Sequence, residues 1–274
     1  MQKRNHILAK KSLGQNFLHN PHYLAAVANA GNIVPGEVVL EIGPGTGNLT
    51  RELLTRGAQV VAIEKDKRLI ETLSSLFAPE IKNKTLRLIE GDALTLEPKH
   101  ILKKPFTYKV IANIPYYITG ALLRAFLSSE HQPSVLVFLV QKEVAERITG
   151  HGTKHTKENL LSLSVKAYGV PRYAGTVPRG AFSPAPNVDS AILVVSNISR
   201  KHFTNKKHEA RFFELIHAGF AQKRKLLRRN LEAVLGGGSA AALEAARIPT
   251  GARAEDVALE QWLIVSNISY CSKD

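Results

Sequence analysis

Short apolar runs alternate with amphipathic stretches over the first 140 residues of the chain. The apolar runs have the length of buried strands and lie at 38–43, 59–64, 86–92, 108–113 and 134–140. The amphipathic stretches repeat at the helical period and predict helices at 21–30, 48–56, 67–77 and 119–128. Strands and helices in this alternation are typical of a parallel sheet that is covered by helices on both faces.

The pattern changes beyond residue 150. A polar loop over 150–159 precedes a predicted helix at 160–169, and the proline-punctuated segment 177–195 leads into a last strand or hairpin. From about residue 200 onward the periodicity is helical only. We therefore expect an α/β domain over residues 1–200 and a small all-helical domain over residues 201–274.

The positive charge of the chain is large and unevenly distributed. The formal net charge is +14. The first 36 residues contain no acid, and residues 200–230 contain ten Lys or Arg residues against two Glu residues. Such an excess favours a polyanionic partner, most simply nucleic acid, over a surface that is charged only for solubility. The basic N-terminal arm and the helical domain are the two candidate contact regions.

Cysteine usage and hydropathy narrow the class of protein. A single cysteine excludes an internal disulfide and a cysteine-based metal cluster, which fits a reducing compartment. No apolar run approaches the roughly 18 residues of a membrane span, and no signal-peptide core follows the basic N-terminus. We expect a cytoplasmic, monomeric protein that uses no metal and does not bind membranes.

Three glycines in the sequence VLEIGPGTGNLT lie between a predicted strand and a predicted helix. Gly43, Gly45 and Gly47 allow a tight turn and close approach of the backbone to a ligand. Twenty-one residues beyond Gly43, Glu64 ends the next strand, where a carboxylate can accept hydrogen bonds from both ribose hydroxyls. The spacing is GxGxG and not the GxGxxG of dinucleotide folds, and a glycine cluster alone is weak evidence. Together with the strand, the helix and the carboxylate in register, it predicts a cofactor site.

The third strand end carries the sequence EGDAL. Asp92 can accept a hydrogen bond from an adenine amino group, and Ala93 offers its backbone N–H; for an Asp after Gly, a plain turn is the alternative. Open parallel sheets bind ligands at the carboxyl ends of their strands, and three successive ends here carry suitable groups. Together they predict an S-adenosylmethionine site in a Rossmann-like class I methyltransferase sheet.

The fourth strand end is IANIPYYITG, residues 111–120. The exocyclic amine of adenine is a poor nucleophile, because its lone pair is delocalised, and it needs acceptors for its two hydrogens before it can attack a methyl group. Asn113 offers a side-chain carbonyl, and the rigid turn before Pro115 presents the main-chain carbonyl of Ile114. Tyr116 offers a face on which the base stacks, worth about 1–3 kcal/mol. The alternative is an Asn–Pro turn with core tyrosines.

With these motifs, the chain resembles the ribosomal RNA adenine N6-dimethyltransferases, in the form that acts on the bacterial small subunit. The matching segments follow in the family's order: KKSLGQNFL (10–18), EIGPGTGNLT (41–50), NIPYYIT (113–119), LVQKEVAERI (139–148), AFSPAPNVDSAIL (181–193) and FFELIHAGFAQKRKLLRRNL (212–231). The resemblance implies dimethylation of two adjacent adenosines in the 16S rRNA of the assembling 30S particle.

The resemblance also implies roles for residues that their own pattern does not single out. Asn16 and Leu18 would join the cofactor site, and Phe182 would close on the target base opposite Tyr116. By pattern alone, Phe182 is a core residue. One departure concerns the loop 150–159, where Glu158 and Asn159 replace the family's usual Tyr–Gly pair, and this leaves the loop conformation open.

Basic residues crowd the C-terminal part of the segment 212–231, whose apolar residues recur at helical spacing. This part contains no acid, whereas a solvated helix face usually mixes both signs. The sequence therefore predicts a surface that contacts the phosphates of folded RNA, with an ordinary solvated face as the alternative. Its residues are Lys223, Arg224, Lys225, Arg228 and Arg229.

Two other functions remain open on this sequence. One is the large-subunit adenine methyltransferase that confers macrolide resistance, which shares the catalytic loop; FAQKRKLLRRNL matches the small-subunit form better. The other is a non-catalytic ribosome-assembly or transcription factor on the same fold. The residues expected for catalysis and cofactor binding argue against this function, because a protein that had lost the activity would not need them. They are Asn113, Pro115, Tyr116 and Glu64.

Overall fold

The computed structural model describes residues 10, 14–102, 107–152 and 157–271. Its contacts divide the chain into two compact units. The first contains the described residues up to Ala145 together with Pro171–Ile198, and the second contains Glu146–Val170 and the described residues from Ser199 onward. Residues 146–170 thus group with the C-terminal helices, although the expected boundary lay near 200. The boundary between independently folding domains stays a prediction.

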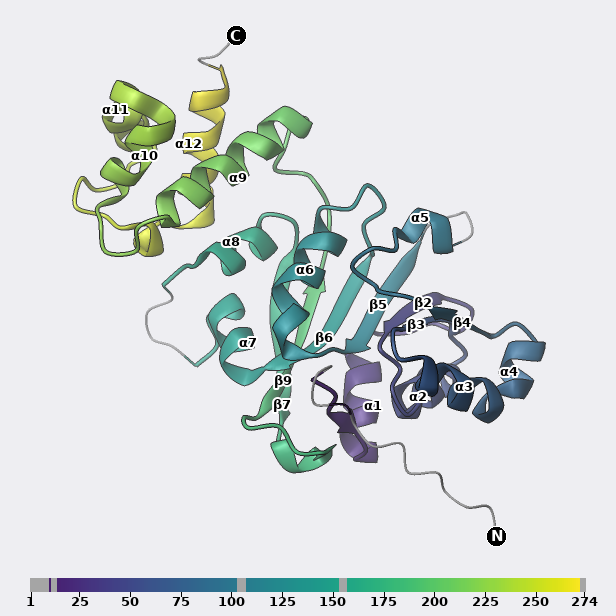
Figure 1. The fold of residues 1–274 in the computed structure, drawn as a ribbon. Coiled ribbons are helices and arrows are strands. Elements are labelled where there is room, and N and C mark those ends of the chain that lie inside the picture. The colour runs from purple at the N-terminus through teal and green to yellow at the C-terminus, as the bar shows by residue number, and fades with distance from the viewer. Residues whose placement is uncertain (1–9, 11–13, 103–106, 153–156, 272–274) are drawn as a thin grey trace. The chain divides into compact units, whose positions relative to one another are not determined.

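The first unit contains a sheet of seven strands in the order β4-β3-β2-β5-β6-β9-β7 (Figure 1). The strands β2 to β6 are parallel neighbours, as predicted, whereas β9 runs antiparallel to β6. The bounds are β2 Val38–Ile42, β3 Gln59–Glu64, β4 Leu86–Glu90, β5 Tyr108–Asn113, β6 Val135–Gln141, β7 Val170–Val177 and β9 Ser190–Ser196. The periodicity did not separate β7, in which only Val177 is buried and the other residues are half-buried or exposed.

Helices cover both faces of this sheet because successive strand residues point to opposite sides. Ile111 lies in the cluster on the face that packs against α1 (Pro21–Ala30), α2 (Asn48–Thr55) and α3 (Lys67–Leu76). On the opposite face, Phe126 of α6 (Thr119–Leu127) packs edge-on against Phe138 of β6, with 6.5 Å between ring centroids. The predicted covered sheet is therefore confirmed.

Three further helices of the α/β region were not among the predicted ones: α4 Ala78–Lys82, α5 Pro98–Ile101 and α7 Lys142–Thr149. With five and four residues, α4 and α5 span little more than one turn, which is too short for a clear helical period. No helix within the described ranges is both long and apolar enough to cross a membrane.

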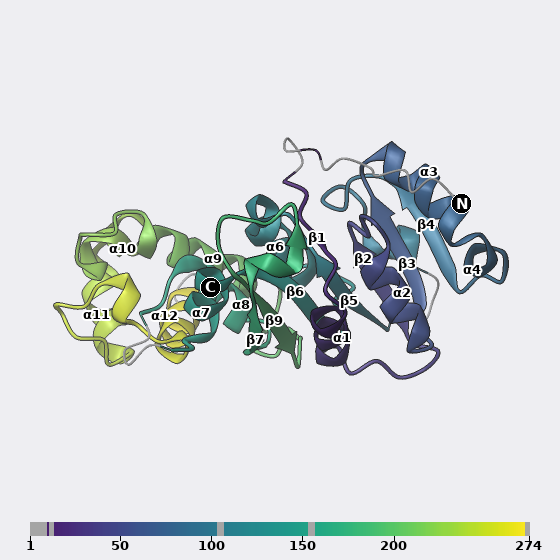
Figure 2. The same ribbon diagram turned by 90° about the horizontal axis from the view of Figure 1, so that it is seen from below.

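The strand order places β2 between β3 and β5. The chain adds β3 and β4 on one side of β2 and then crosses over to add β5 and β6 on the other side. This reversal opens a crevice at the carboxyl ends of the strands. The N-terminal segment, here Lys10 and residues 14–18, is held there by a two-stranded ladder between β1 (Phe17–Leu18) and β8 (Phe182–Ser183). Figure 2 shows the N-terminal segment and the sheet from below.

The second unit is helical, as expected for the C-terminal region. Its helices are α8 Leu160–Lys166, α9 Lys206–Phe220, α10 Leu227–Leu235, α11 Ser239–Ala245 and α12 Leu259–Cys271. Trp262 is fully buried and stacks on Phe220 at 6.2 Å. A Cβ at Gly219 would lie 2.3 Å from the Trp262 ring, so this glycine allows α9 and α12 to pack closely.

The unusual pair Glu158 and Asn159 begins α8. The Asn159 side chain accepts a hydrogen bond from the Ser162 N–H at 2.9 Å, and Ser162 Oγ accepts from the Asn159 N–H at 2.8 Å. This reciprocal pair is a capping box. Glu158 is held by an ion pair to Lys166. Glu158 and Asn159, which replace the family's usual Tyr–Gly pair, thus form the start of α8. Residues 153–156 of the loop lie outside the described residues.

Candidate active site

A cleft lies at the carboxyl ends of β2 to β5, beneath the N-terminal segment. All predicted cofactor residues except Gly47 line it, namely Asn16, Leu18, Gly43, Gly45, Glu64, Asp92, Ala93 and Asn113. The predicted catalytic residues Ile114, Pro115 and Tyr116 line it as well. The fold therefore brings together groups from four strand ends and one N-terminal segment.

The glycine-rich loop forms one wall of the cleft. Gly43 and Gly45 have φ values of 65° and 60°, which favour glycine. A Cβ at Gly45 would lie 2.8 Å from the Phe17 ring, so the loop and the N-terminal segment are in close contact. Gly47 differs, since a Cβ there would lie 2.5 Å from the Phe77 ring. Packing against α3 and Phe77, not contact with the cleft, accounts for the third glycine.

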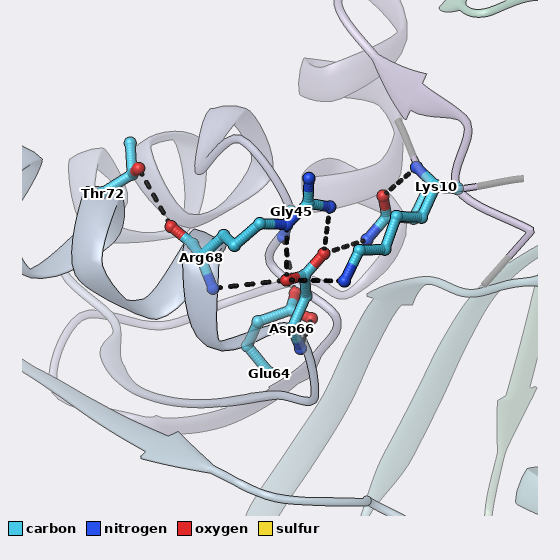
Figure 3. Close-up of polar contacts among 7 residues, drawn as sticks. Lys10, Gly45, Glu64, Asp66, Arg68 and Thr72 are labelled. Carbon is cyan, nitrogen blue, oxygen red and sulfur yellow. Dashed lines mark hydrogen bonds and ion pairs between the residues drawn. The ribbon is translucent and has the colours of Figure 1, made fainter. Parts of the chain in front are cut away.

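Glu64 is 6% exposed and is held by two backbone donors (Figure 3). Its Oε2 accepts from the Gly45 N–H at 3.2 Å, and its Oε1 accepts from the Asp66 N–H at 2.8 Å. Burial raises the pKa of this carboxyl, and the two N–H groups oppose the shift. Each carboxylate oxygen keeps a lone pair for a further donor. This arrangement fits a carboxylate that accepts from ribose hydroxyls.

Asp92 at the end of β4 is fixed by a cation and a turn. Lys65 Nζ lies 2.8 Å from Oδ2, and the Leu94 N–H donates to Oδ1 at 3.0 Å. The hydrogen bond from Lys65 lowers the pKa of Asp92. The carboxylate therefore stays ionised and can only accept hydrogen bonds, which suits an amino group as its partner.

The orientation of the Asn113 side chain is fixed. Its Nδ2 donates to the main-chain oxygen of Asn16 at 2.9 Å. Because a carbonyl oxygen can only accept, the nitrogen of the amide must face Asn16. Asn113 Oδ1 then points away from this bond and has no hydrogen-bond partner among the described residues. The site thus presents a free side-chain acceptor beside the turn at Pro115.

Tyr116 is held by a residue that the sequence did not single out. Its hydroxyl lies 2.6 Å from Oγ of Ser190, a fully buried residue at the start of β9. Burial raises the pKa of Tyr116, so the phenol stays protonated at neutral pH and is not a base. The hydrogen bond fixes the direction of the ring.

Phe182 does not lie in the cleft in this structure. Its side chain is 4% exposed, belongs to the core cluster and pairs through β8 with Leu18. This is the core position that its sequence pattern alone suggested. A role opposite Tyr116 stays a prediction, and it requires the ring to leave the core when substrate binds.

The predicted RNA-contacting residues are all exposed in the second unit. They do not lie on one continuous helix, because α9 ends at Phe220 and α10 begins at Leu227. Lys223, Arg224 and Lys225 occupy the turn between the two helices, and Arg228 and Arg229 lie in the first turn of α10. Asn230 fixes the turn by donating to the main-chain oxygen of Gly219 at 2.6 Å.

A second buried carboxyl group, Glu41, lines the cleft and was missed by the sequence analysis. It is 1% exposed, accepts from Thr50 Oγ1 at 2.7 Å, and its Oε1 has no partner among the described residues. Burial raises the pKa of Glu41 to about 8, and the charge of Glu64 adds to the shift. The one sequence feature that points to Glu41 is its position two residues before Gly43, the first glycine of the glycine-rich loop.

We expect Glu41→Gln to stabilise the protein more at pH 8 than at pH 5. A raised pKa in the folded state means that the unfolded chain loses its proton first, so stability falls as pH rises from about 4.5 to about 8. Glutamine keeps the shape and never ionises. Thermal unfolding without cofactor should show a gain of several degrees in Tm at pH 8 that disappears towards pH 4.5. A gain that is equal at both pH values would contradict this assignment.

Among the described residues, no cluster of His, Cys, Asp or Glu side chains could hold a metal ion. The residues that sequence reasoning missed around the cleft are Gln15, Glu41, Asn48, Asp66 and Ser190. Gln15, Asn48 and Ser190 stand within the motif segments, and Asp66 lies two residues beyond Glu64, but the partners of all four lie far away in sequence. No local pattern could have identified those partners.

Comparisons with known proteins find relatives over most of the chain. The family model for "Ribosomal RNA adenine dimethylase" matches residues 7–270. "Ribosomal RNA small subunit methyltransferase A" of Dehalococcoides mccartyi strain 195 is 40% identical over 257 residues, which cover 93% of this chain and 86% of that protein. The protein of the same name from Deinococcus radiodurans is 41% identical and covers 91% of this chain and 82% of its own length.

Two solved structures also superpose on most of the chain. The 23S rRNA methyltransferase ErmE has a TM-score of 0.72 at 27% identity and covers 92% of this chain and 98% of its own. A dimethyladenosine transferase from Plasmodium falciparum has a TM-score of 0.71 at 26% identity, with coverage of 91% and 95%. With a family model that spans nearly all 274 residues, this chain belongs to the ribosomal RNA adenine dimethylase family.

Proposed function

We propose that this protein transfers methyl groups from S-adenosylmethionine to N6 of two adjacent adenosines in small-subunit ribosomal RNA, during assembly of the subunit. Relatives that are 40–41% identical are named as small-subunit methyltransferases. The large-subunit enzyme ErmE is more distant, at 27% identity. This difference supports the small-subunit substrate over the large-subunit alternative.

The cleft residues fit S-adenosylmethionine. Glu64 would accept hydrogen bonds from the ribose hydroxyls, and Asp92 and Ala93 would bind the adenine ring. The main chain of Gly43 and Gly45 would lie in close contact with the cofactor. The cofactor, when bound, supplies an activated sulfonium methyl group. Catalysis by the chain is then mainly placement of the amine in line with this methyl group, which can contribute roughly 7–11 kcal/mol.

The observation that carries the proposal is the orientation of Asn113. Its Nδ2 is bound to Asn16, which leaves Oδ1 free at the strand end where the amine would arrive. An acceptor there, together with the main-chain oxygen of Ile114, would hold the two amine hydrogens and turn the nitrogen lone pair towards the methyl group. Neither group needs to change its protonation state.

The basic surface of the second unit supports an RNA substrate. The first turn of α10 has no side-chain cap and no acid, and it carries two arginines. Basic side chains are unfavourable at a helix N-terminus unless an anion binds there, because the helix dipole is positive at this end. Phosphates would compensate both the dipole and the cations. The N-terminal arm, whose residues lie mostly outside the described ranges, stays a second predicted contact.

The direct test is methyl transfer to purified ribosomal particles. Small subunits that lack the modification should accept labelled methyl groups from S-adenosylmethionine, and mapping should place them at N6 of two adjacent adenosines. Large-subunit precursors serve as the matched substrate. Transfer to the large subunit alone would favour the resistance-type activity, and cofactor binding without transfer to either would favour an assembly factor.

We expect Tyr116→Ala to weaken capture of the target base by about 1–3 kcal/mol, the worth of a stacked base. Tyr116→Phe and Ser190→Ala should each cost less, about 0.5–1.5 kcal/mol, because they keep the ring and lose only its hydrogen bond. The measurement is kcat/KM for the RNA substrate. A Phe variant as damaged as the Ala variant would mean that the hydroxyl takes part in the chemistry.

A further inference from the structure

A buried carboxylate next to the cleft has no role in the mechanism above. Asp66 is 3% exposed and follows Glu64 by two residues. Its Oδ1 caps α3 by accepting from the Arg68 N–H at 3.2 Å and also accepts from Arg68 Nε at 3.0 Å (Figure 3). Capping a helix is a sufficient structural reason for this oxygen.

The other oxygen of Asp66 makes a different connection. Oδ2 accepts from Arg68 Nη2 at 2.7 Å and from Gln15 Nε2 at 3.3 Å. Gln15 is 51 residues away in sequence, so its bond to Asp66 is not part of the cap of α3. Its Oε1 accepts from the Lys10 N–H at 2.8 Å, and Lys10 Nζ lies 3.7 Å from Asp66 Oδ1. One carboxylate therefore caps a helix and anchors the N-terminal segment.

Both ends of this connection lie in the active site. The Asp66 N–H donates to Oε1 of Glu64 at 2.8 Å. Directly after Gln15, the main-chain oxygen of Asn16 accepts from Asn113 Nδ2 at 2.9 Å. The carboxylate assigned to the ribose and the amide assigned to the amine are thus joined through Asp66 and the Gln15–Asn16 peptide.

We propose that Asp66 is a positioning residue, whose bond to Gln15 holds Asn16 against Asn113 and so couples the cofactor carboxylate to the orientation of the catalytic amide. This inference rests on the proposed function of the cleft. Without the bond, the segment keeps its anchors at β1–β8 and at Asn48, which donates to the main-chain oxygen of Leu18 at 2.9 Å. The segment then stays attached, but Asn16 no longer fixes the Asn113 side chain.

The test compares Asp66→Asn, Gln15→Ala and the double variant in the full-length protein. Asparagine is a good helix cap, so Asp66→Asn keeps α3 and removes the charged acceptor that faces Gln15. Each single variant should lower kcat about tenfold, a typical coupling between sites, with little change in Tm. The kcat of the double variant should be no lower than that of either single variant, because both substitutions remove the same Gln15–Asp66 hydrogen bond.

Two further variants separate positioning from structure. Arg68→Gln removes the guanidinium but leaves the bond to Gln15, and it should keep a kcat near that of the parent protein. The exchange pair, Gln15→Glu with Asp66→Asn, re-creates the bond with donor and acceptor reversed and should recover part of the lost kcat. A purely structural role for Asp66 would show no such rescue.

The outcomes distinguish this inference from the proposed function. If the parent binds S-adenosylmethionine and transfers methyl groups, but Gln15→Ala has the parent's kcat, Asp66 merely caps α3 and the inference fails alone. An exchange pair no better than Asp66→Asn would overturn it in the same way. A parent that bound no S-adenosylmethionine by calorimetry would overturn the proposed function and, with it, this inference.

Discussion

Replacing Asn113 with alanine should lower kcat for methyl transfer by about 10²–10³-fold, the usual loss when one preorganised polar contact to the reacting group is removed. The Asn113 Oδ1 atom has no hydrogen-bond partner among the described residues, and Asn113 is the last residue of β5, the strand end where the amine would bind. The amine is absent from the binary complex, so the dissociation constant for S-adenosylmethionine should change by only a few-fold. Single-turnover transfer and calorimetry measure the two quantities.

Asn48 offers a matched control for this prediction. Its Nδ2 also donates to a main-chain oxygen of the N-terminal segment, that of Leu18, at the same distance of 2.9 Å. Asn48→Ala therefore removes an equivalent anchor without removing the acceptor, and it should lose much less of kcat. If cofactor affinity collapsed in parallel with activity in Asn113→Ala, Asn113 would be mainly a cofactor ligand.

Reversing Arg224, Arg228 and Arg229 to Glu should weaken binding to the ribosomal substrate by at least about tenfold and leave cofactor affinity unchanged. All three side chains are exposed around the turn that leads into α10. If each neutralises a phosphate, the slope of log affinity against log salt should flatten by about 0.7–0.9 for each lost contact. The measurement is substrate binding across a salt series, with a thermal melt to exclude unfolding.

The control for this experiment is a triple reversal of Lys82, Lys84 and Lys99, which are exposed and lie in the α/β region, outside both basic regions. It changes the net charge by the same amount, so it separates local contact from overall attraction. The control should keep a salt slope close to that of the parent protein. An unchanged slope in the folded arginine variant would mean that this surface is only solvated and that the basic N-terminal arm holds the RNA.

The sequence by itself determined the framework of the site. The predicted strands at 59–64 and 108–113 coincide with β3 and β5, and the remaining parallel strands differ only at their ends. Because parallel strands end at one edge of a sheet, residues at successive strand ends had to meet there. That is why Glu64, Asp92 and Asn113 could be placed together in advance. The glycines, the Asn–Pro turn and the exposed cations follow from local chemistry in the same way.

Only the tertiary structure decided which distant side chains complete that framework. Gln15 meets Asp66 across 51 residues, and Tyr116 meets Ser190 across 74. Tertiary packing also placed Gly47 against the Phe77 ring and outside the lining of the cleft. The physical reason is that periodicity records which face of an element is apolar, whereas a hydrogen bond between two elements depends on how closely and at what register they pack.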